Sequence, residues 1–106
     1  MNSGETLKQQ VEELWQKHLP LMLSRLDVLA RAIDALSRGV IHGDLKMQAA
    51  AEAHKLAGSL GTFGLEAASD SALCIERLLA TQRTPADEAA GLAEHLRIVR
   101  ESIHSR

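Results

Sequence analysis

The chain of 106 residues is long enough for one compact domain, residues 1–106, and too short for two. Its apolar fraction of 45% can supply one core, and its low aromatic content, with one Trp, one Phe and no Tyr, argues against an all-β fold. The 12 basic and 14 acidic residues are mixed along the chain and give a net charge of −2, which disfavours a nucleic-acid partner.

The first part of the chain carries two apolar patterns of helical spacing, one on each side of Pro20. The pattern before Pro20 predicts a helix that ends at about His18. Its apolar residues are Leu7, Val11, Leu14 and Trp15. Pro20 then either kinks this helix or opens the next one, which is predicted to end at Gly39. The apolar residues of this second segment are Met22, Leu26, Leu29, Ile33 and Leu36.

A third and a fourth helix are predicted on either side of a glycine-containing connection over residues 61–64. Gly43 and Asp44 supply a turn and an N-cap for the third helix, which we expect to stop near Gly61. The apolar stripe of the third helix is Leu45, Ala49, Ala53, Leu56 and Leu60. The stripe of the fourth helix is Leu65, Ala68, Ala72, Ile75 and Leu79.

A fifth amphipathic helix is predicted at the end of the chain. Thr84, Pro85 and Asp87 match an N-cap, a first-turn proline and a capping-box acid. The apolar residues that follow them are Leu92, Leu96, Val99 and Ile103. Because short connections make successive helices antiparallel neighbours, the sequence predicts an all-α fold: an up-and-down antiparallel four-helix bundle with an additional or kinked N-terminal helix.

His54 lies on the third predicted helix, nearly opposite the centre of its apolar stripe at about 100° per residue. We therefore expect its imidazole to face solvent. The outward positions around it are occupied by Met47, Ala51 and Gly58, where charged residues would be usual, and Lys55 lies at one side. This face predicts a docking surface around an exposed histidine.

Gly58 is unusual because it lies inside the predicted helix, one turn after His54. A glycine at such a position costs about 1 kcal/mol relative to alanine, and no cap or turn is needed there. It either leaves space beside the imidazole for a phosphoryl group or a partner loop, or it permits two helices to cross closely.

The segment that begins at His54 contains five features in register. They are a histidine, an apolar residue two positions later, a glycine four positions later, a serine after that glycine, and a glycine ten positions later. The residues concerned are His54, Leu56, Gly58, Ser59 and Gly64. This pattern resembles the signature of the histidine-containing phosphotransfer (HPt) family, whose fold is a four-helix bundle. The Ile75–Glu76 pair resembles a Leu-Glu pair of that family and extends the similarity to about residues 50–80.

The resemblance implies roles for particular side chains. His54 is implied to be the phosphoryl acceptor, and Glu76 to orient its ring; without the resemblance, Glu76 is an ordinary exposed glutamate. The family often has a lysine three residues after the histidine, where this chain has Ala57. Lys55 is therefore either a charge partner of the phosphoryl group or a solvated surface lysine.

The function that the resemblance implies is that of a phosphorelay intermediate in two-component signalling, which takes a phosphoryl group from one receiver-domain aspartate and passes it to another. An exposed neutral imidazole is a nucleophile near neutral pH, since its unperturbed pKa is about 6.5. Mg²⁺ and most of the catalysis would belong to the receiver, so we expect a phosphocarrier without a cofactor or metal of its own. The expected partners are response-regulator receiver domains and a hybrid histidine kinase. A monomer would bind them through Met47, Ala51, Gly58 and Ser59.

Several functions fit the sequence less well. Autokinase activity needs a phosphate loop, and neither GxxxxGK nor GxGxxG occurs. In a kinase dimerisation domain an acidic residue and then a proline usually follow the histidine, where this chain has Lys55 and no nearby proline. A di-metal bundle needs two Glu-x-x-His pairs, and only Glu101 and His104 fit. The alternative function is a non-phosphorylated helical interaction module that docks a receiver or kinase.

The sequence also bears on where the protein is found. Cys74 is its only cysteine, so no internal disulfide can form, and a reducing compartment is the simplest expectation. No stretch approaches the roughly 18 consecutive apolar residues of a membrane span. We therefore expect a soluble cytoplasmic protein.

Overall fold

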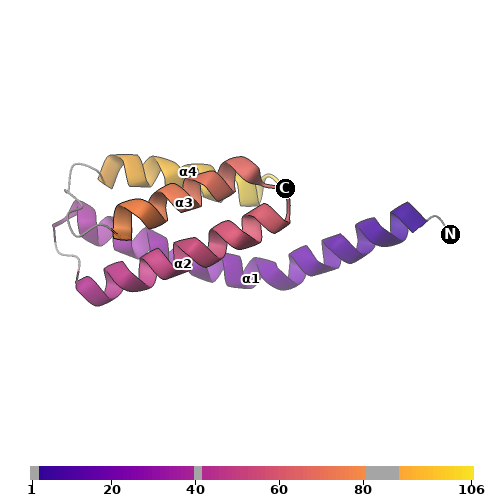
Figure 1. Cartoon of the computed structure of the whole chain (residues 1–106), viewed down its shortest axis with the longest axis horizontal. Coiled ribbons are helices and arrows are strands. Elements are labelled where there is room, and N and C mark those ends of the chain that lie inside the picture. The colour runs from indigo at the N-terminus through magenta and orange to yellow at the C-terminus, as the bar shows by residue number, and fades with distance from the viewer. Residues whose placement is uncertain (1–2, 40–41, 81–88) are drawn as a thin grey trace.

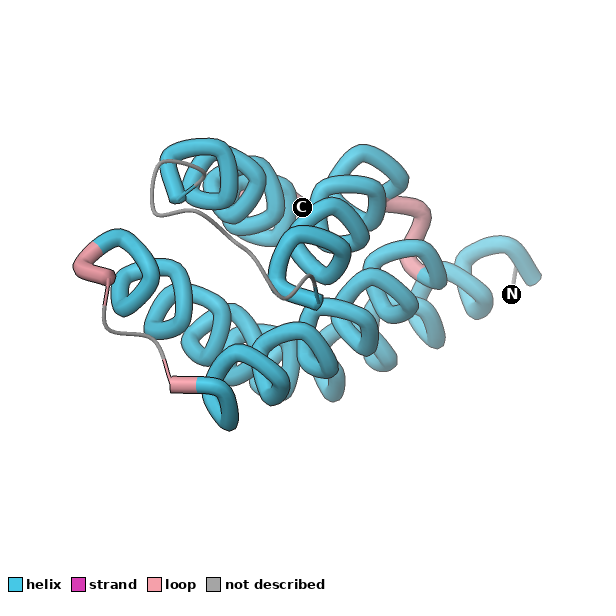
Figure 2. The backbone as a smooth tube through the Cα atoms, turned by 60° about the vertical axis from the view of Figure 1, so that its left-hand side comes forward, coloured by secondary structure: helices cyan, strands magenta, loops and turns pink. Residues whose placement is uncertain are grey.

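The computed structural model describes residues 3–39, 42–80 and 89–106, and these residues form four α-helices and no strand. The helices are α1 (Ser3–Ser37), α2 (Gly43–Thr62), α3 (Glu66–Ala80) and α4 (Ala89–His104). Consecutive helices run in opposite directions (Figure 1), and helices make up nearly all of the described backbone (Figure 2). Each helix packs against its neighbours in sequence, and α1 closes the bundle against α4. The predicted all-α, up-and-down four-helix bundle is confirmed.

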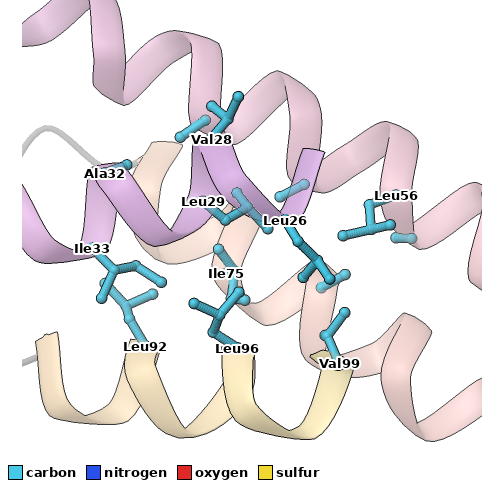
Figure 3. Close-up of a cluster of buried hydrophobic side chains, with 14 of the residues drawn as sticks. Leu26, Val28, Leu29, Ala32, Ile33, Leu56, Ile75, Leu92, Leu96 and Val99 are labelled. Carbon is cyan, nitrogen blue, oxygen red and sulfur yellow. The ribbon is translucent and has the colours of Figure 1, made fainter. Parts of the chain in front are cut away.

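The apolar stripes of the four helices meet in one core (Figure 3). The predicted stripes of the second half of α1 and of α4 are buried along their whole length. In α2 and α3 the predicted stripes are also buried, except that Leu45 and Leu65 at their starts are only half-buried. Many core positions of α2 and α3 are alanines, so these two helices approach each other closely. This close packing fixes the register between His54 on α2 and the residues of α3 that face it.

A matched pair of substitutions on α1 tests this core. Leu29 is fully buried, whereas Leu7 on the same helix is 62% exposed. We expect Leu29→Ala to lower the free energy of unfolding by about 2–5 kcal/mol, because it leaves a cavity, and Leu7→Ala to change it by less than about 0.5 kcal/mol. Urea unfolding followed by circular dichroism measures both. Equal losses in the two variants would contradict the burial of Leu29.

The first half of α1 departs from the prediction of a helix ending at His18. Helix α1 is continuous from Ser3 to Ser37, with Pro20 inside it, so a separate N-terminal helix is wrong. The axis of α1 bends along its length in Figure 1, as the alternative of a kinked helix requires. A proline inside a helix costs about 3 kcal/mol, whereas burying Trp15 and Met22 on either side contributes about 1.5–3 kcal/mol each. Burial of the flanking residues therefore explains why the helix continues.

The N-terminal part of α1 extends beyond the bundle (Figure 1). Its predicted apolar residues Leu7, Val11 and Leu14 are exposed, and only Trp15 is buried. The Trp15 ring meets the Phe63 ring edge-on at 5.1 Å between centroids. This contact holds α1 against the turn that follows α2.

Arg106 also packs against Trp15. The Arg106 guanidinium lies 4.3 Å from the Trp15 ring centroid, and its Nη1 donates to Glu12 Oε2 at 3.1 Å. Hydrogen bonds from Gln16 and Arg106 lower the pKa of the Glu12 carboxyl. The end of the chain is thereby joined to α1 by a cation–π contact and an ion pair.

Helix α2, which carries His54, begins and ends close to the predicted positions. The helix begins at Gly43, one residue before the predicted N-cap Asp44, and His42 is the N-cap with an extended backbone. The prediction that Asp44 caps this helix is therefore wrong; Asp44 lies in the first turn, where a carboxylate suits the helix dipole. The expected end near Gly61 is confirmed to within one residue, at Thr62.

A tight turn joins α2 to α3. Leu65 N–H donates to the Leu60 carbonyl at 2.9 Å and Gly64 N–H donates to the Gly61 carbonyl at 3.1 Å, the two bonds of a Schellman motif. Gly64 has φ +78°, a backbone conformation that favours glycine. The glycine ten residues after His54 therefore has a backbone role: it reverses the chain so that α3 packs back along α2. The expected cap residues Thr84, Pro85 and Asp87 lie outside the described residues.

Candidate functional site

His54 lies near the middle of α2 with 70% of its side chain exposed, as the sequence predicted. The buried residues of α2 point into the core on the other side of the helix. Since a rigid, capped helix carries the imidazole, its backbone is fixed while its ring stays accessible. An exposed neutral ring on a fixed backbone can act as a nucleophile toward a partner that docks from solvent.

Glu76 on α3 is the partner of the His54 ring. His54 Nδ1 lies 3.1 Å from Glu76 Oε1, and 30% of the Glu76 side chain is exposed. An ionised carboxylate can only accept hydrogen bonds, so the neutral ring carries its proton on Nδ1 and donates it to Glu76. The lone pair then resides on Nε2, which has no bonding partner among the described residues. The structure brings together the two residues that the resemblance paired.

The position of Glu76 follows from the packing of α3. Its neighbour Ile75 is fully buried, which points Glu76 along the edge between α3 and α2. Nearer the turn, Ser69 Oγ donates to the Ala57 carbonyl at 2.8 Å and joins the same two helices. Core packing and this hydrogen bond together hold Glu76 opposite His54.

Gly58 lies one turn after His54 and is exposed. A Cβ built on Gly58 meets no heavy atom within 4 Å, apart from the helix's own neighbouring backbone. Close helix crossing, one of the two roles that the sequence leaves open for this glycine, is therefore wrong. The missing side chain leaves open space beside the imidazole, as the alternative role requires.

The remaining predicted residues divide into two groups. Met47 and Ala51 are exposed on the same side of α2 as His54, and Met47 is 74% exposed. Lys55 and the half-buried Ser59 instead line a surface pocket between α2 and α1. Lys55 Nζ lies 3.8 Å from Glu52 Oε1. The outward face of α2 thus combines the exposed residues around His54 with a pocket next to it that both polar and apolar side chains line.

Sequence reasoning missed one charged residue of this pocket. Arg25 on α1 lines it, and its Nε donates to Glu52 Oε2 at 3.1 Å. The pair joins two helices and is separated by 27 positions in the sequence. A charged residue within the apolar pattern of α1 is the one sequence signal for Arg25, and it does not indicate which helix it meets.

Metal ligands and membrane spans are not found in the described parts of the chain. Within residues 3–39, 42–80 and 89–106, no three His, Cys, Asp or Glu side chains gather in a way that could hold a metal ion. In the part of the chain that the structure describes, no helix is both long and apolar enough to cross a membrane. His18, His42 and His104 are exposed and His95 is half-buried, as expected for solvent or boundary residues.

Comparison with known proteins gives one match. A family model of the Hpt domain matches residues 13–104 of the 106-residue chain. The match includes His54 and Glu76, and it begins within α1, after Leu7 and Val11. No curated protein and no solved structure matches the chain significantly.

Proposed function

The chain belongs to the Hpt domain family, whose members are phosphotransfer modules of two-component signalling, and from this membership we propose that it is a phosphorelay intermediate. It accepts a phosphoryl group from the aspartate of one receiver domain on His54 and passes it to the aspartate of another. The observation that carries the proposal is the geometry of His54: an exposed ring whose Nδ1 is bonded to Glu76 and whose Nε2 is accessible.

The proposed reaction forms one bond and breaks one. The Nε2 lone pair of neutral His54 attacks the phosphorus of the receiver's aspartyl phosphate in line, and the acyl P–O bond breaks. The aspartate leaves as a carboxylate with the bonding electron pair, and the ring becomes a phosphorylated imidazolium. Its Nδ1–H stays bonded to Glu76, whose negative charge stabilises the cationic ring. Transfer to the next receiver is the reverse reaction.

This chain and the receiver domain are proposed to contribute different groups to the reaction. Phosphoryl transfer depends on positioning and on neutralising charge, for which Mg²⁺ and cationic groups serve. We assign Mg²⁺ and most of the transition-state stabilisation to the docked receiver, and the nucleophile to this chain. Hpt domains are phosphocarriers rather than catalysts, which agrees with this division. The exposed Met47 and Ala51 and the open space at Gly58 form the proposed docking face.

Transfer from receiver domains tests the proposal directly. Purified receivers are phosphorylated with a small acyl phosphate in the presence of Mg²⁺, freed of the donor, and mixed with the full chain. We expect the chain to gain an acid-labile, base-stable phosphate, which a second, unphosphorylated receiver then removes. If no receiver labels the chain, the relay function is excluded. Binding of a receiver without labelling would instead support a non-phosphorylated interaction module.

A substitution at Glu76 tests the role assigned to its carboxylate. We expect Glu76→Ala to slow phosphoryl transfer by about threefold to tenfold, because the ring loses a charge-assisted hydrogen bond that is partly exposed to solvent. Glu76→Gln keeps an acceptor oxygen and should retain more of the rate. Single-turnover transfer measures both, with Asp70→Asn, at an exposed position on the same helix, as the control. An unchanged rate in Glu76→Ala would remove Glu76 from the mechanism.

A further inference from the structure

Exposed apolar side chains gather on the first part of α1. Within the described residues, five of the six large apolar side chains that are exposed lie on this part of the helix. They are Leu7, Val11, Leu14, Leu21 and Leu23. Exposed apolar residues that gather on one element, in contrast to single ones scattered over the surface, indicate an interaction site.

Three of these leucines form a line along α1, which we call the leucine line. Leu7, Leu14 and Leu21 are seven residues apart, close to two helical turns, so they project from the same side of the helix. Their exposed fractions are 62%, 50% and 47%. Leu23 lies about 200° around the helix from Leu21 and projects from the other side.

The leucine line leads into the pocket beside Gly58. Leu21 and His18 of α1 line this pocket together with Gly58 of α2, and more of its surface is apolar than polar. Leu14 lies one turn before His18, on the same side of α1. The exposed apolar surface of α1 is therefore continuous with the part of the proposed docking face that Gly58 leaves open.

The spacing of the leucines along α1 matches the size of a folded partner domain. At about 1.5 Å per residue, Leu14 lies about 10 Å along the axis from Leu21, and Leu7 lies about 21 Å from it. A compact domain of about 100 residues has a radius of gyration of about 13 Å, and so a diameter of about 30 Å. Seated over Gly58, such a domain covers Leu21 and extends to Leu14, whereas Leu7 lies at its edge.

The residues between the leucines favour a transient protein partner over a lipid surface. From residue 6 to residue 21, α1 carries two lysines and two glutamates, so it lacks the excess of basic residues that anionic lipids attract. Polar residues separate the leucines, as in interfaces that form and dissociate. A receiver leaves His54 after each transfer, and a second copy of the chain seated on Leu14 and Leu21 would compete with it for the pocket.

We propose that the leucine line is a second docking surface for the receiver domain, next to His54, and that it binds an apolar patch on the receiver. It contributes to the affinity for the receiver and takes no part in the chemistry at His54. The Hpt family model matches from residue 13, so the line extends the docking surface beyond the part of the chain that the family shares. The inference rests on the proposed function, which supplies the receiver as the partner.

Transfer to the full chain, measured over a range of concentrations of a phosphorylated receiver, tests this surface. We expect Leu14→Ala to raise the receiver concentration at half-maximal rate by about threefold to tenfold, because a half-exposed leucine loses most of its apolar contact. Leu7→Ala should raise it by less than about threefold, since Leu7 lies at the edge of the contact. The maximal rate should not change. Leu23→Ala, 38% exposed on the other side of α1, is the matched control and should behave like the wild type.

Labelling with a small donor separates docking from chemistry. Phosphoramidate transfers its phosphoryl group to a histidine ring: its N–P bond breaks, ammonia leaves, and the Nε2–P bond forms. Leu14→Ala should be labelled by phosphoramidate at the wild-type rate, which shows that its fold and its His54 are intact. If Leu14→Ala loses both reactions, Leu14 has a structural role and the docking surface is overturned.

Other occupants of the leucine line give different results. A wild-type dimer in analytical ultracentrifugation that Leu14→Ala dissociates would assign the line to a second copy and overturn the inference. Pelleting of the wild type, but not of Leu14→Ala, with phosphatidylcholine–phosphatidylglycerol vesicles would assign it to a lipid surface. An unchanged half-maximal concentration in Leu14→Ala would overturn the docking surface alone, whereas absence of label on the wild type from every receiver would overturn the proposed function as well.

Discussion

His54→Gln is expected to abolish phosphoryl acceptance from every receiver domain that labels the wild type. Glutamine has nearly the length of histidine and can still bond to Glu76, but its side-chain amide has no nucleophilic lone pair equivalent to that of Nε2. Because 70% of the His54 side chain is exposed, the free energy of unfolding should change by less than about 0.5 kcal/mol. The loss of label would then be chemical and not a consequence of unfolding.

The measurement is the amount of acid-labile phosphate after incubation with a phosphorylated receiver, alongside thermal unfolding followed by circular dichroism. His42→Gln and His104→Gln are matched controls, since both histidines are exposed and neither lines the proposed site. Both control variants should label like the wild type. Full labelling of His54→Gln would show that the acceptor is another residue, and the proposed relay mechanism would then be wrong.

The sequence predicted the face on which His54 lies because helical periodicity records which side of a helix is buried. In α2 the buried residues recur every three to four positions, and the exposed imidazole lies away from them. The same reasoning predicted the helices of the bundle and, from the short connection over residues 61–64, that α2 and α3 are antiparallel neighbours; Gly64 in this connection has positive φ. Local patterns were sufficient for these features.

Features that depend on how two helices meet could not be predicted in the same way. The continuity of α1 through Pro20 depends on the burial of Trp15 and Met22 against the rest of the bundle. The bond from Arg25 to Glu52 depends on where α1 crosses α2. Periodicity identifies the buried face of each helix but not the residue on another helix that lies opposite a given side chain. The pocket beside Gly58, which Arg25 lines, was missed for this reason.

Substitutions at Gly58 are expected to change two properties in opposite directions. They should raise the free energy of unfolding and lower the rate of phosphoryl transfer. Nothing lies within 4 Å of a Cβ added at Gly58, and alanine is favoured over glycine inside a helix by about 1 kcal/mol. We therefore expect Gly58→Ala to stabilise the protein, and Gly58→Leu to leave it at least as stable as the wild type. In Gly58→Leu the new side chain occupies the space beside the His54 ring, and phosphoryl transfer should fall by about tenfold to a hundredfold, because in-line attack tolerates little displacement.

Gly91→Ala on α4 is the matched control, since a Cβ there also meets nothing within 4 Å and the position is remote from His54. It should raise stability without changing transfer, which separates a blocked face from a general effect of a stiffer bundle. Thermal unfolding and single-turnover transfer, measured on all three variants, decide the matter. If Gly58→Leu transfers as fast as the wild type, the receiver does not use the space beside the ring, and the docking face must lie on the other side of His54. If Gly58→Leu transfers more slowly while its free energy of unfolding is unchanged or higher, Gly58 keeps the space beside His54 open at a cost in helix stability. Its position in the middle of α2 is then explained.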